Sequence, residues 1–266
     1  MTPIRTAARR LAVPAALAAA AAFALVSPPG TAQAADEAAP DAGSSPTRLT
    51  PWPASGASAP APWRISGLPR QKKPFTAFSV VSIDGRRALR IDADNSYGNL
   101  LHPLRIEPGK YKTLSWRWQI ERLNEAADLN ERTGDDTTVK LCALFDLPLE
   151  KVPFVERQTL RVARSRSDDF VPTATICYVW DNRLPVGTSL PSPFTGRLRY
   201  VVLQSGSSRV GQWVSERRDL AADFQRQFGK ESGGEPVALI GIAVGADSDN
   251  TREHTVAHVA DLVLEP

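Results

Sequence analysis

The sequence has little of the side-chain chemistry on which most enzymes depend. Its 266 residues include only two cysteines, three histidines and one methionine. It has no Gly-x-Ser-x-Gly nucleophile elbow, no phosphate-binding Gly-Lys-Ser/Thr loop and no dinucleotide-binding fingerprint. No cluster of cysteines and histidines offers a closed zinc site. These absences remove support for the common hydrolase, nucleotidase and dehydrogenase chemistries, and they favour a protein without catalytic activity.

The chain also lacks an excess of charge of one sign once its first 34 residues are set aside. It has 32 Lys and Arg against 29 Asp and Glu, but Arg5, Arg9 and Arg10 lie in an N-terminal segment that contains no acidic residue. The remainder is neutral. A neutral chain with interspersed charges has no overall attraction for DNA or an anionic membrane, so we expect no nucleic-acid partner.

The first 34 residues have the pattern of a secretory signal peptide. An arginine-containing start is followed by the alanine-rich apolar run 11–26, and Ala32-Gln33-Ala34 supplies small residues for cleavage before Ala35. The apolar run contains Pro14 and is shorter than the ~18–20 residues that span a bilayer. We therefore predict an exported protein, periplasmic or extracellular, with no transmembrane segment in the mature chain.

The two cysteines, Cys142 and Cys177, lie in strand-like runs at 137–145 and 173–180. An oxidising compartment favours a disulfide between an even pair. The alternative is two separate buried small residues. The sequence leaves both open because pairing depends on geometry.

The remaining chain divides into a spacer and a domain. Residues 35–62 are rich in Ala, Pro and Ser, and we expect a flexible segment there, followed by one folded domain over 63–266. Within the domain, Leu114, Trp116, Trp118 and Ile120 alternate with polar residues, which is typical of a strand with one buried face. Similar runs lie at 76–83, 88–93, 137–145, 173–180, 197–204, 237–244 and 255–264. Many short strands separated by Gly and Pro turns predict a sandwich or barrel.

Two helices interrupt this pattern. Asp219 is placed to cap a short helix in which Leu220, Phe224 and Phe228 recur every four residues, with Gly229 placed to end it. Pro153 opens a second helix that we expect to continue to about residue 166.

Several pieces of the domain together resemble a known family. They are Leu114-Ser-Trp-Arg-Trp118, Gly134-Asp-Asp136, Cys177-Tyr-Val-Trp180, Arg218-Asp219, Phe228-Gly229, Asp247-Ser-Asp-Asn-Thr251 and Ala260-Asp-Leu-Val-Leu264. In this order and spacing the chain resembles the secreted bacterial proteins catalogued as domain of unknown function 3047. The resemblance implies export and a β-sandwich similar to carbohydrate-binding modules, but no catalytic residue. We therefore predict an all-β fold, a single jelly-roll-like antiparallel β-sandwich with one or two short inserted helices.

Aromatic residues suggest one ligand-binding face. Tyr178 and Trp180 share a face of their strand, and on an open surface their rings make a stacking platform for sugars, with Arg117 as a polar neighbour. The alternative for these rings is core packing.

An acidic pair suggests the polar part of the same face. Asp135 and Asp136 point to opposite faces if they are in a strand, so they cannot flank one glycosidic bond at ~5–9.5 Å. Asp136 therefore either contacts a ligand with Lys140 or caps the start of a strand against a basic partner such as Arg117 or Lys140.

The stretch 247–253 supplies oxygen atoms at alternate positions, as calcium loops do. Asp247, Asp249 and Asn250 are the candidate Ca²⁺ ligands, although Thr251 and Arg252 depart from the usual pattern. The alternative is an Asx-stabilised turn that binds no metal. Apart from Ca²⁺, the sequence indicates no cofactor.

Three functions fit these features. The first is a non-catalytic exported protein that binds a glycan or another envelope component. The second is a carbohydrate-active hydrolase or lyase that uses Asp135 or Asp136 with a carboxylate from 247–253. The third is a structural envelope protein with no small-molecule site.

Overall fold

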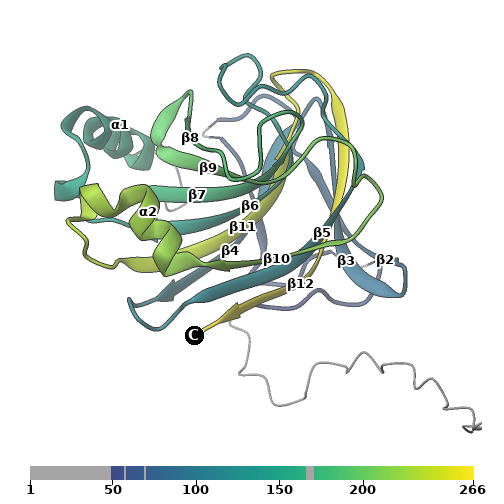
Figure 1. Ribbon diagram of the computed structural model, residues 1–266, viewed down its shortest axis with the longest axis horizontal. Coiled ribbons are helices and arrows are strands. Elements are labelled where there is room, and N and C mark those ends of the chain that lie inside the picture. Colours follow the sequence, from purple (N-terminus) through teal and green to yellow (C-terminus); the bar gives the residue numbers. More distant parts are fainter. Residues whose placement is uncertain (1–48, 57, 69, 166–170) are drawn as a thin grey trace, which may run out of the picture. The chain divides into compact units, whose positions relative to one another are not determined.

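Two β-sheets pack face to face in the computed structural model, which describes residues 49–56, 58–68, 70–165 and 171–266 (Figure 1). The larger sheet has seven strands in the order β1 (Arg64–Ser66), β4 (Tyr97–Ile106), β11 (Ala238–Asp247), β6 (Thr137–Asp146), β7 (Ala174–Asp181), β9 (Thr195–Ser205) and β8 (Ser189–Ser192). The smaller sheet has five, in the order β10 (Val214–Asp219), β5 (Thr113–Arg122), β12 (His254–Glu265), β3 (Arg86–Asp94) and β2 (Ala77–Ile83). The predicted jelly-roll-like β-sandwich is confirmed, with one departure from antiparallel pairing, because β7 and β9 run parallel.

Aromatic rings from both sheets meet in the core between them. Trp116 and Trp118 of β5 face inward, as their alternation predicts, and are at most 2% exposed. The ring centroids of Trp116 and Tyr178 lie 5.5 Å apart, and those of Trp118 and Trp180 lie 6.1 Å apart. These contacts join β5 of the smaller sheet to β7 of the larger one.

Helix α2 (Leu220–Ser232) begins at the expected cap, because the Asp219 carboxylate accepts a hydrogen bond from the Ala222 N–H at 2.9 Å. Its end lies further along than predicted. Gly229 is helical, and the chain leaves the helix at Gly233, whose φ of 69° gives the left-handed C-cap that glycine favours. Phe224 and Phe228 are buried in the core.

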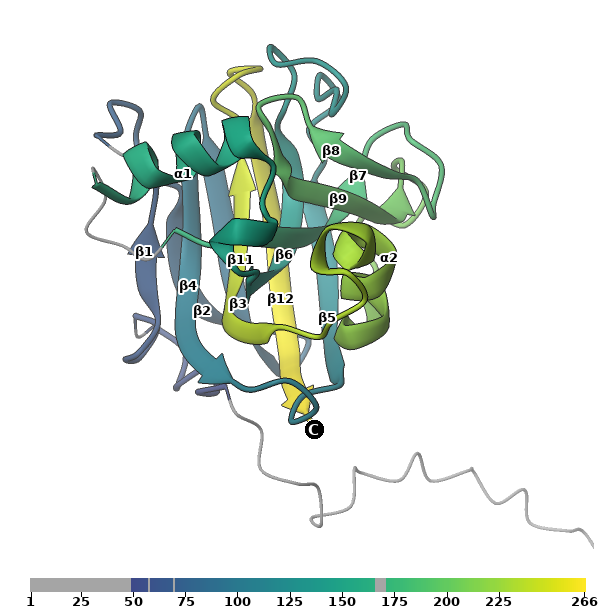
Figure 2. The same ribbon diagram turned by 90° about the vertical axis from the view of Figure 1, so that its left-hand side faces the viewer.

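The second predicted helix is α1 (Phe154–Ser165), which follows the 3-10 turn η1 (Leu149–Lys151). Figure 2 shows α1 lying across the outer face of the larger sheet, the face turned away from the sandwich core. Leu160 is its buried residue. No helix among the described residues is long and apolar enough to span a membrane.

The segment before β1 differs from the flexible spacer expected to reach residue 62. Leu49 and Trp52 are buried with the core, and the Trp63 indole N–H donates to the Thr50 carbonyl at 2.7 Å. The Thr50 N–H in turn donates to His102 of β4 at 3.1 Å. Tryptophan and leucine side chains at these positions give the end of the segment apolar area to bury. The predicted signal peptide, residues 1–34, and the start of the spacer lie outside the described residues.

Strands β1, β4, β8 and β10 were not predicted from the sequence. Pro103 is the reason that β4 was not predicted. A proline cannot donate a hydrogen bond to a neighbouring strand, so it argues against a central strand. The structure accommodates it because β1 pairs with β4 only at 99–101, and Pro103 therefore has a neighbouring strand on one side alone.

Candidate functional site

A cleft of about 280 Å³ lies between α1 and the outer face of the larger sheet. Leu101 of β4, Cys142 and Leu144 of β6, and Ala243 of β11 contribute to its floor. On the α1 side it is bounded by Ala163, together with residues 171 and 172. The outer face of this sheet is therefore partly covered, and the covering leaves a hollow.

The predicted disulfide lies in the floor of this cleft. Cys142 of β6 and Cys177 of β7 are directly opposite each other in the antiparallel register, and the structure joins them. Both residues are less than 5% exposed. The first of the two alternatives left open by the sequence is thus confirmed.

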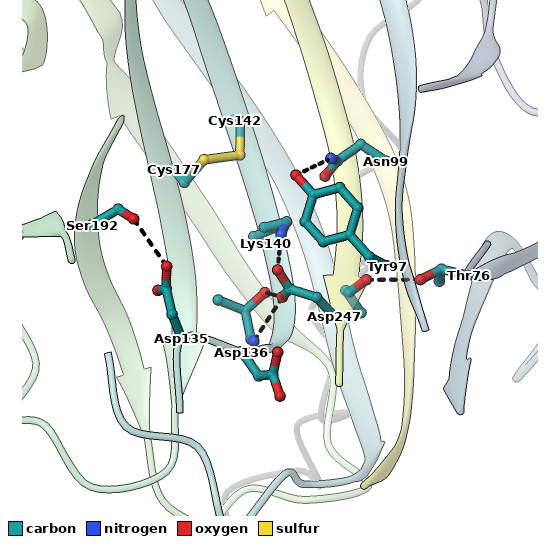
Figure 3. Close-up of polar contacts among 12 residues, drawn as sticks. Thr76, Tyr97, Asn99, Asp135, Asp136, Lys140, Cys142, Cys177, Ser192 and Asp247 are labelled. Carbon is teal, nitrogen blue, oxygen red and sulfur yellow. Dashed lines mark hydrogen bonds and ion pairs between the residues drawn. A yellow bond between two sulfur atoms is a disulfide. The ribbon is translucent and has the colours of Figure 1, made fainter. Parts of the chain in front are cut away.

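A buried ion pair adjoins the disulfide on the same face. The Lys140 ammonium lies 2.5 Å from Oδ2 of Asp247, and each side chain is 4% exposed (Figure 3). Oδ1 of Asp247 accepts hydrogen bonds from the Thr137 hydroxyl and, at 2.7 Å, from the Thr137 N–H. Burial lowers the pKa of Lys140, but the charge and hydrogen bond of Asp247, together with the nearby Tyr97 and Asp135, raise that pKa overall. Lys140 is therefore charged at neutral pH.

Asp135 lies on the same face, on the far side of Lys140 from Tyr97 (Figure 3). Its Oδ2 accepts a hydrogen bond from the Ser192 hydroxyl of β8 at 2.9 Å, while its Oδ1 has no hydrogen-bond partner in the described part of the chain. Burial, reinforced by the Asp247 charge, raises the pKa of Asp135 to about 6. This carboxyl group therefore gains or loses its charge near neutral pH.

Asp136, which like Asp135 lies just before β6, has a different set of partners. Its Oδ2 accepts hydrogen bonds from the N–H and the hydroxyl of Thr251, both at 2.7 Å. Its Oδ1 accepts one from the Asn250 side-chain amide at 3.1 Å. Asp136 thus fixes the loop that follows β11, a structural role whose partners differ from the basic residues expected from the sequence.

The predicted calcium ligands have other partners. Asp247 is bonded to Lys140 and Thr137, and Asn250 donates to Asp136. Asp249 has a carboxylate oxygen without a partner in the described residues. Within 49–56, 58–68, 70–165 and 171–266, no three His, Cys, Asp or Glu side chains form a group that could hold a metal. The Ca²⁺ site stays a prediction.

The aromatic platform does not form, and this corrects the ligand-binding assignment of its residues. Tyr178 and Trp180 are at most 1% exposed because they face the opposite sheet, and their polar atoms have partners within the protein. Arg117 lies in the smaller sheet, 3.8 Å from Asp261. The structure therefore brings together Lys140 and Asp247 from the predicted set, and it separates them from the two rings and from Arg117.

The contribution of β4 to the site was not predicted from the sequence. The Tyr97 ring lies 5.0 Å from the Lys140 ammonium, and the Tyr97 hydroxyl accepts a hydrogen bond from the Asn99 amide at 3.4 Å. A side chain at Gly245 would meet Asn99 Oδ1 at 2.4 Å, so glycine there makes room for Asn99. The alternation of Tyr97, Asn99 and Leu101 was the available signal, which Pro103 obscured.

These features define a β-sandwich of two sheets. A partly covered cleft lies on the outer face of the larger sheet, and the disulfide forms part of its floor. The chain belongs to the family described as Protein of unknown function (DUF3047), whose model matches residues 61–263. A comparison with curated proteins found no match.

Among solved structures, the chain is similar to TmCBM61 in complex with β-1,4-galactotriose (TM-score 0.30, 11% identity, covering 77% of this chain and 88% of that one). It is also similar to the cellulase endo-1,4-β-glucanase CelB2 (TM-score 0.38, 12% identity, 76% and 93%). A third similar structure is the family 11 xylanase from Neocallimastix patriciarum (TM-score 0.31, 11% identity, 76% and 90%).

Proposed function

We propose that this protein is exported and binds a short glycan in the cleft without cleaving it. The observation that carries the proposal is the mixed character of the cleft. Leu101, Leu144 and the disulfide present apolar surface, while Tyr97 and Thr175 present hydroxyl groups. A sugar ring has the same two parts, an apolar C–H face and a rim of hydroxyls, and small-molecule sites commonly pair apolar walls with a few polar groups.

Binding without cleavage is favoured by the state of the carboxylates. Glycosidases generally need two carboxyl groups free to act on one bond. Both oxygens of Asp247 already accept hydrogen bonds from Lys140 and Thr137, and both oxygens of Asp136 accept them from the loop after β11. Asp135 and Asp249 each have one oxygen without a partner in the described part of the chain, but neither lines the cleft, so the cleft lacks the pair of free carboxylates that hydrolysis needs.

Export is supported by two independent features of the chain. Residues 1–34 have the three-part pattern of a signal peptide. The Cys142–Cys177 disulfide belongs to an oxidising compartment, where such bonds persist. An envelope or extracellular glycan is the class of ligand that such a protein meets.

The test is a glycan array with the exported protein, followed by calorimetric titration of each hit. Ala163→Trp places an indole in the cleft from the α1 side, and we expect it to weaken binding at least about tenfold. Ala221→Trp, on the exposed surface of α2, is the matched control and should leave affinity unchanged. Thermal melting of both variants verifies that they fold.

Two outcomes would contradict the proposal. Absence of binding to any glycan would remove the function altogether. Release of reducing ends from a bound oligosaccharide, lost in Asp135→Asn, would instead establish the carbohydrate-active enzyme.

A further inference from the structure

We infer that the cleft selects an uncharged sugar that carries a small apolar substituent, such as an O-acetyl or a methyl ester group. The inference rests on the proposed function and adds the chemical class of the ligand. Three properties of the cleft lead to it: the distribution of apolar side chains, the neutralisation of its lysine, and its size.

Apolar groups surround one part of the cleft on both sides. Leu101 and Leu144 extend from β4 and β6, and Leu198 extends from β9. Ala163 and Val171 face them from the α1 side, and the buried disulfide lies between. The hydroxyls of an unsubstituted sugar would lose water here and, apart from the Thr175 hydroxyl between Leu144 and Leu198, gain no side-chain partner, which is unfavourable. A methyl or acetyl group would fill the same space and bury apolar area on every side.

The charge of the cleft disfavours an anionic ligand. Among the described residues that line it, Lys140 is the only charged one, and its ammonium is already paired with Asp247 at 2.5 Å. Asp135 adds negative charge beside this pair when it is ionised. A uronate or phosphate group would lose its hydration in the cleft and find no unpaired cation there, so no interaction would offset the free-energy cost of its desolvation. Esterification or acetylation removes that penalty because the group is then neutral.

The size of the cleft limits the ligand to a short segment. Its volume of about 280 Å³ is close to the lower end of the ~300–1,000 Å³ typical of small-molecule sites. Polar groups are concentrated at Tyr97, Asn99 and Lys140, and the apolar wall, which includes Thr175 between Leu144 and Leu198, lies beside them. One substituted sugar unit fits this division, with its ring hydroxyls toward the polar side chains and its substituent toward the leucines.

The experiment uses two matched pairs of oligosaccharides in calorimetric titrations of the exported protein. An O-acetylated xylo-oligosaccharide is compared with the same preparation after saponification, which tests the apolar substituent. A methyl-esterified oligogalacturonide is compared with its free acid, which tests charge. We expect the neutral, substituted member to bind at least about tenfold more tightly in a pair whose backbone is accepted, the scale on which apolar pockets distinguish one small group.

A cleft variant separates recognition from folding. Leu144→Asn keeps the side chain's size but makes the wall polar, and it should abolish the preference, so that the acetylated and saponified forms bind with equal affinity. Leu68→Asn, at a side chain that is 50% exposed and outside the cleft lining, should leave the preference intact.

Equal affinities within both pairs, or preference for the free acid, would overturn the inference and leave glycan binding standing. Absence of binding to every saccharide tested, on the array as well as in these titrations, would overturn the proposed function itself.

Discussion

Both faces of the larger sheet carry buried side chains, but the inner face carries mainly aromatic and aliphatic ones and the outer face carries a disulfide and an ion pair. On the inner face, Ile176, Tyr178 and Trp180 of β7 pack against the smaller sheet and are almost completely inaccessible. On the outer face of the β6–β7 pair lie the disulfide and the Lys140–Asp247 ion pair (Figure 3), beside a cleft whose lining includes Ala163 of α1. The inner face is filled by rings, whereas the outer one retains a cleft.

Two buried carboxylates express this difference. Asp223 accepts hydrogen bonds from the Tyr178 hydroxyl at 2.7 Å and from Arg218 at 2.7 and 2.9 Å. Burial raises its pKa, but these hydrogen bonds, the Arg218 charge and a bond from Arg226 together lower the pKa overall. Asp135 interacts with the uncharged hydroxyls of Ser192 and Tyr200 and has no arginine partner of this kind, and burial raises its pKa to about 6. A fully bonded buried charge stabilises a fold, whereas a partly bonded one marks a candidate site.

The largest effect that tests this contrast is expected from Lys140→Met on the outer face. The substitution leaves Asp247 buried beside an apolar side chain, and the free energy of unfolding should fall by about 3–5 kcal/mol. Urea denaturation at pH 7 measures this loss. Lys110→Met, at an exposed position, is the matched control and should change stability by no more than about 0.5 kcal/mol.

A double variant shows whether the loss comes from the uncompensated charge. Lys140→Met combined with Asp247→Asn removes both charges and retains an amide oxygen for the Thr137 donors. We expect it to recover most of the stability lost in the single variant. If the double variant is as unstable as the single one, lost packing rather than charge explains the effect.

A smaller, pH-dependent effect is expected from Asp135→Asn. Because the pKa of Asp135 is raised from its usual 3.8 to about 6, the folded protein holds this proton more tightly than the unfolded chain does. The stabilisation from that proton is fully present below about pH 4 and is lost as the pH rises to about 6. Relative to Asp135→Asn, the wild-type protein should therefore lose on the order of 2–3 kcal/mol across this interval.

Denaturation of both proteins at pH 4, 5, 6 and 7 makes this measurement. The asparagine variant is the reference for the wild-type protein, because the two proteins share every other titrating group. A difference in stability that stays constant over these four pH values would show that Asp135 is not perturbed.

The sequence predicted the fold better than it predicted the site, and the strands explain why. The alternation of apolar and polar residues in β5 was informative because one side of that strand faces the hydrophobic core. Trp116 and Trp118 could therefore be assigned to the inner face. In β6 nearly every residue is buried, because the core lies on one side and the covered outer face on the other. Alternation in β6 therefore could not show which face is open.

The site residues depended on pairings that no local pattern contains. Lys140 and Asp247 meet because β6 and β11 are neighbours although they are distant in sequence. Tyr178 and Trp180 were predicted to stack against a sugar, but aromatic residues also pack well in hydrophobic cores. In this fold both rings lie on the inner face of β7. Local sequence patterns therefore identified candidate site residues, and the strand order determined which of them lie together.

The smallest effect is expected on the inner face, from Tyr178→Phe. This variant keeps the ring and removes only the hydroxyl that donates to Asp223, a carboxylate that Arg218 and Arg226 still bond. The free energy of unfolding should fall by about 1–2 kcal/mol, with glycan affinity unchanged, since Tyr178 contacts the core and not the cleft. Denaturation and calorimetric titration of the same preparation measure both quantities. Loss of glycan binding with stability intact would place the ligand on the inner side of the sheet and reverse the distinction drawn between the two faces.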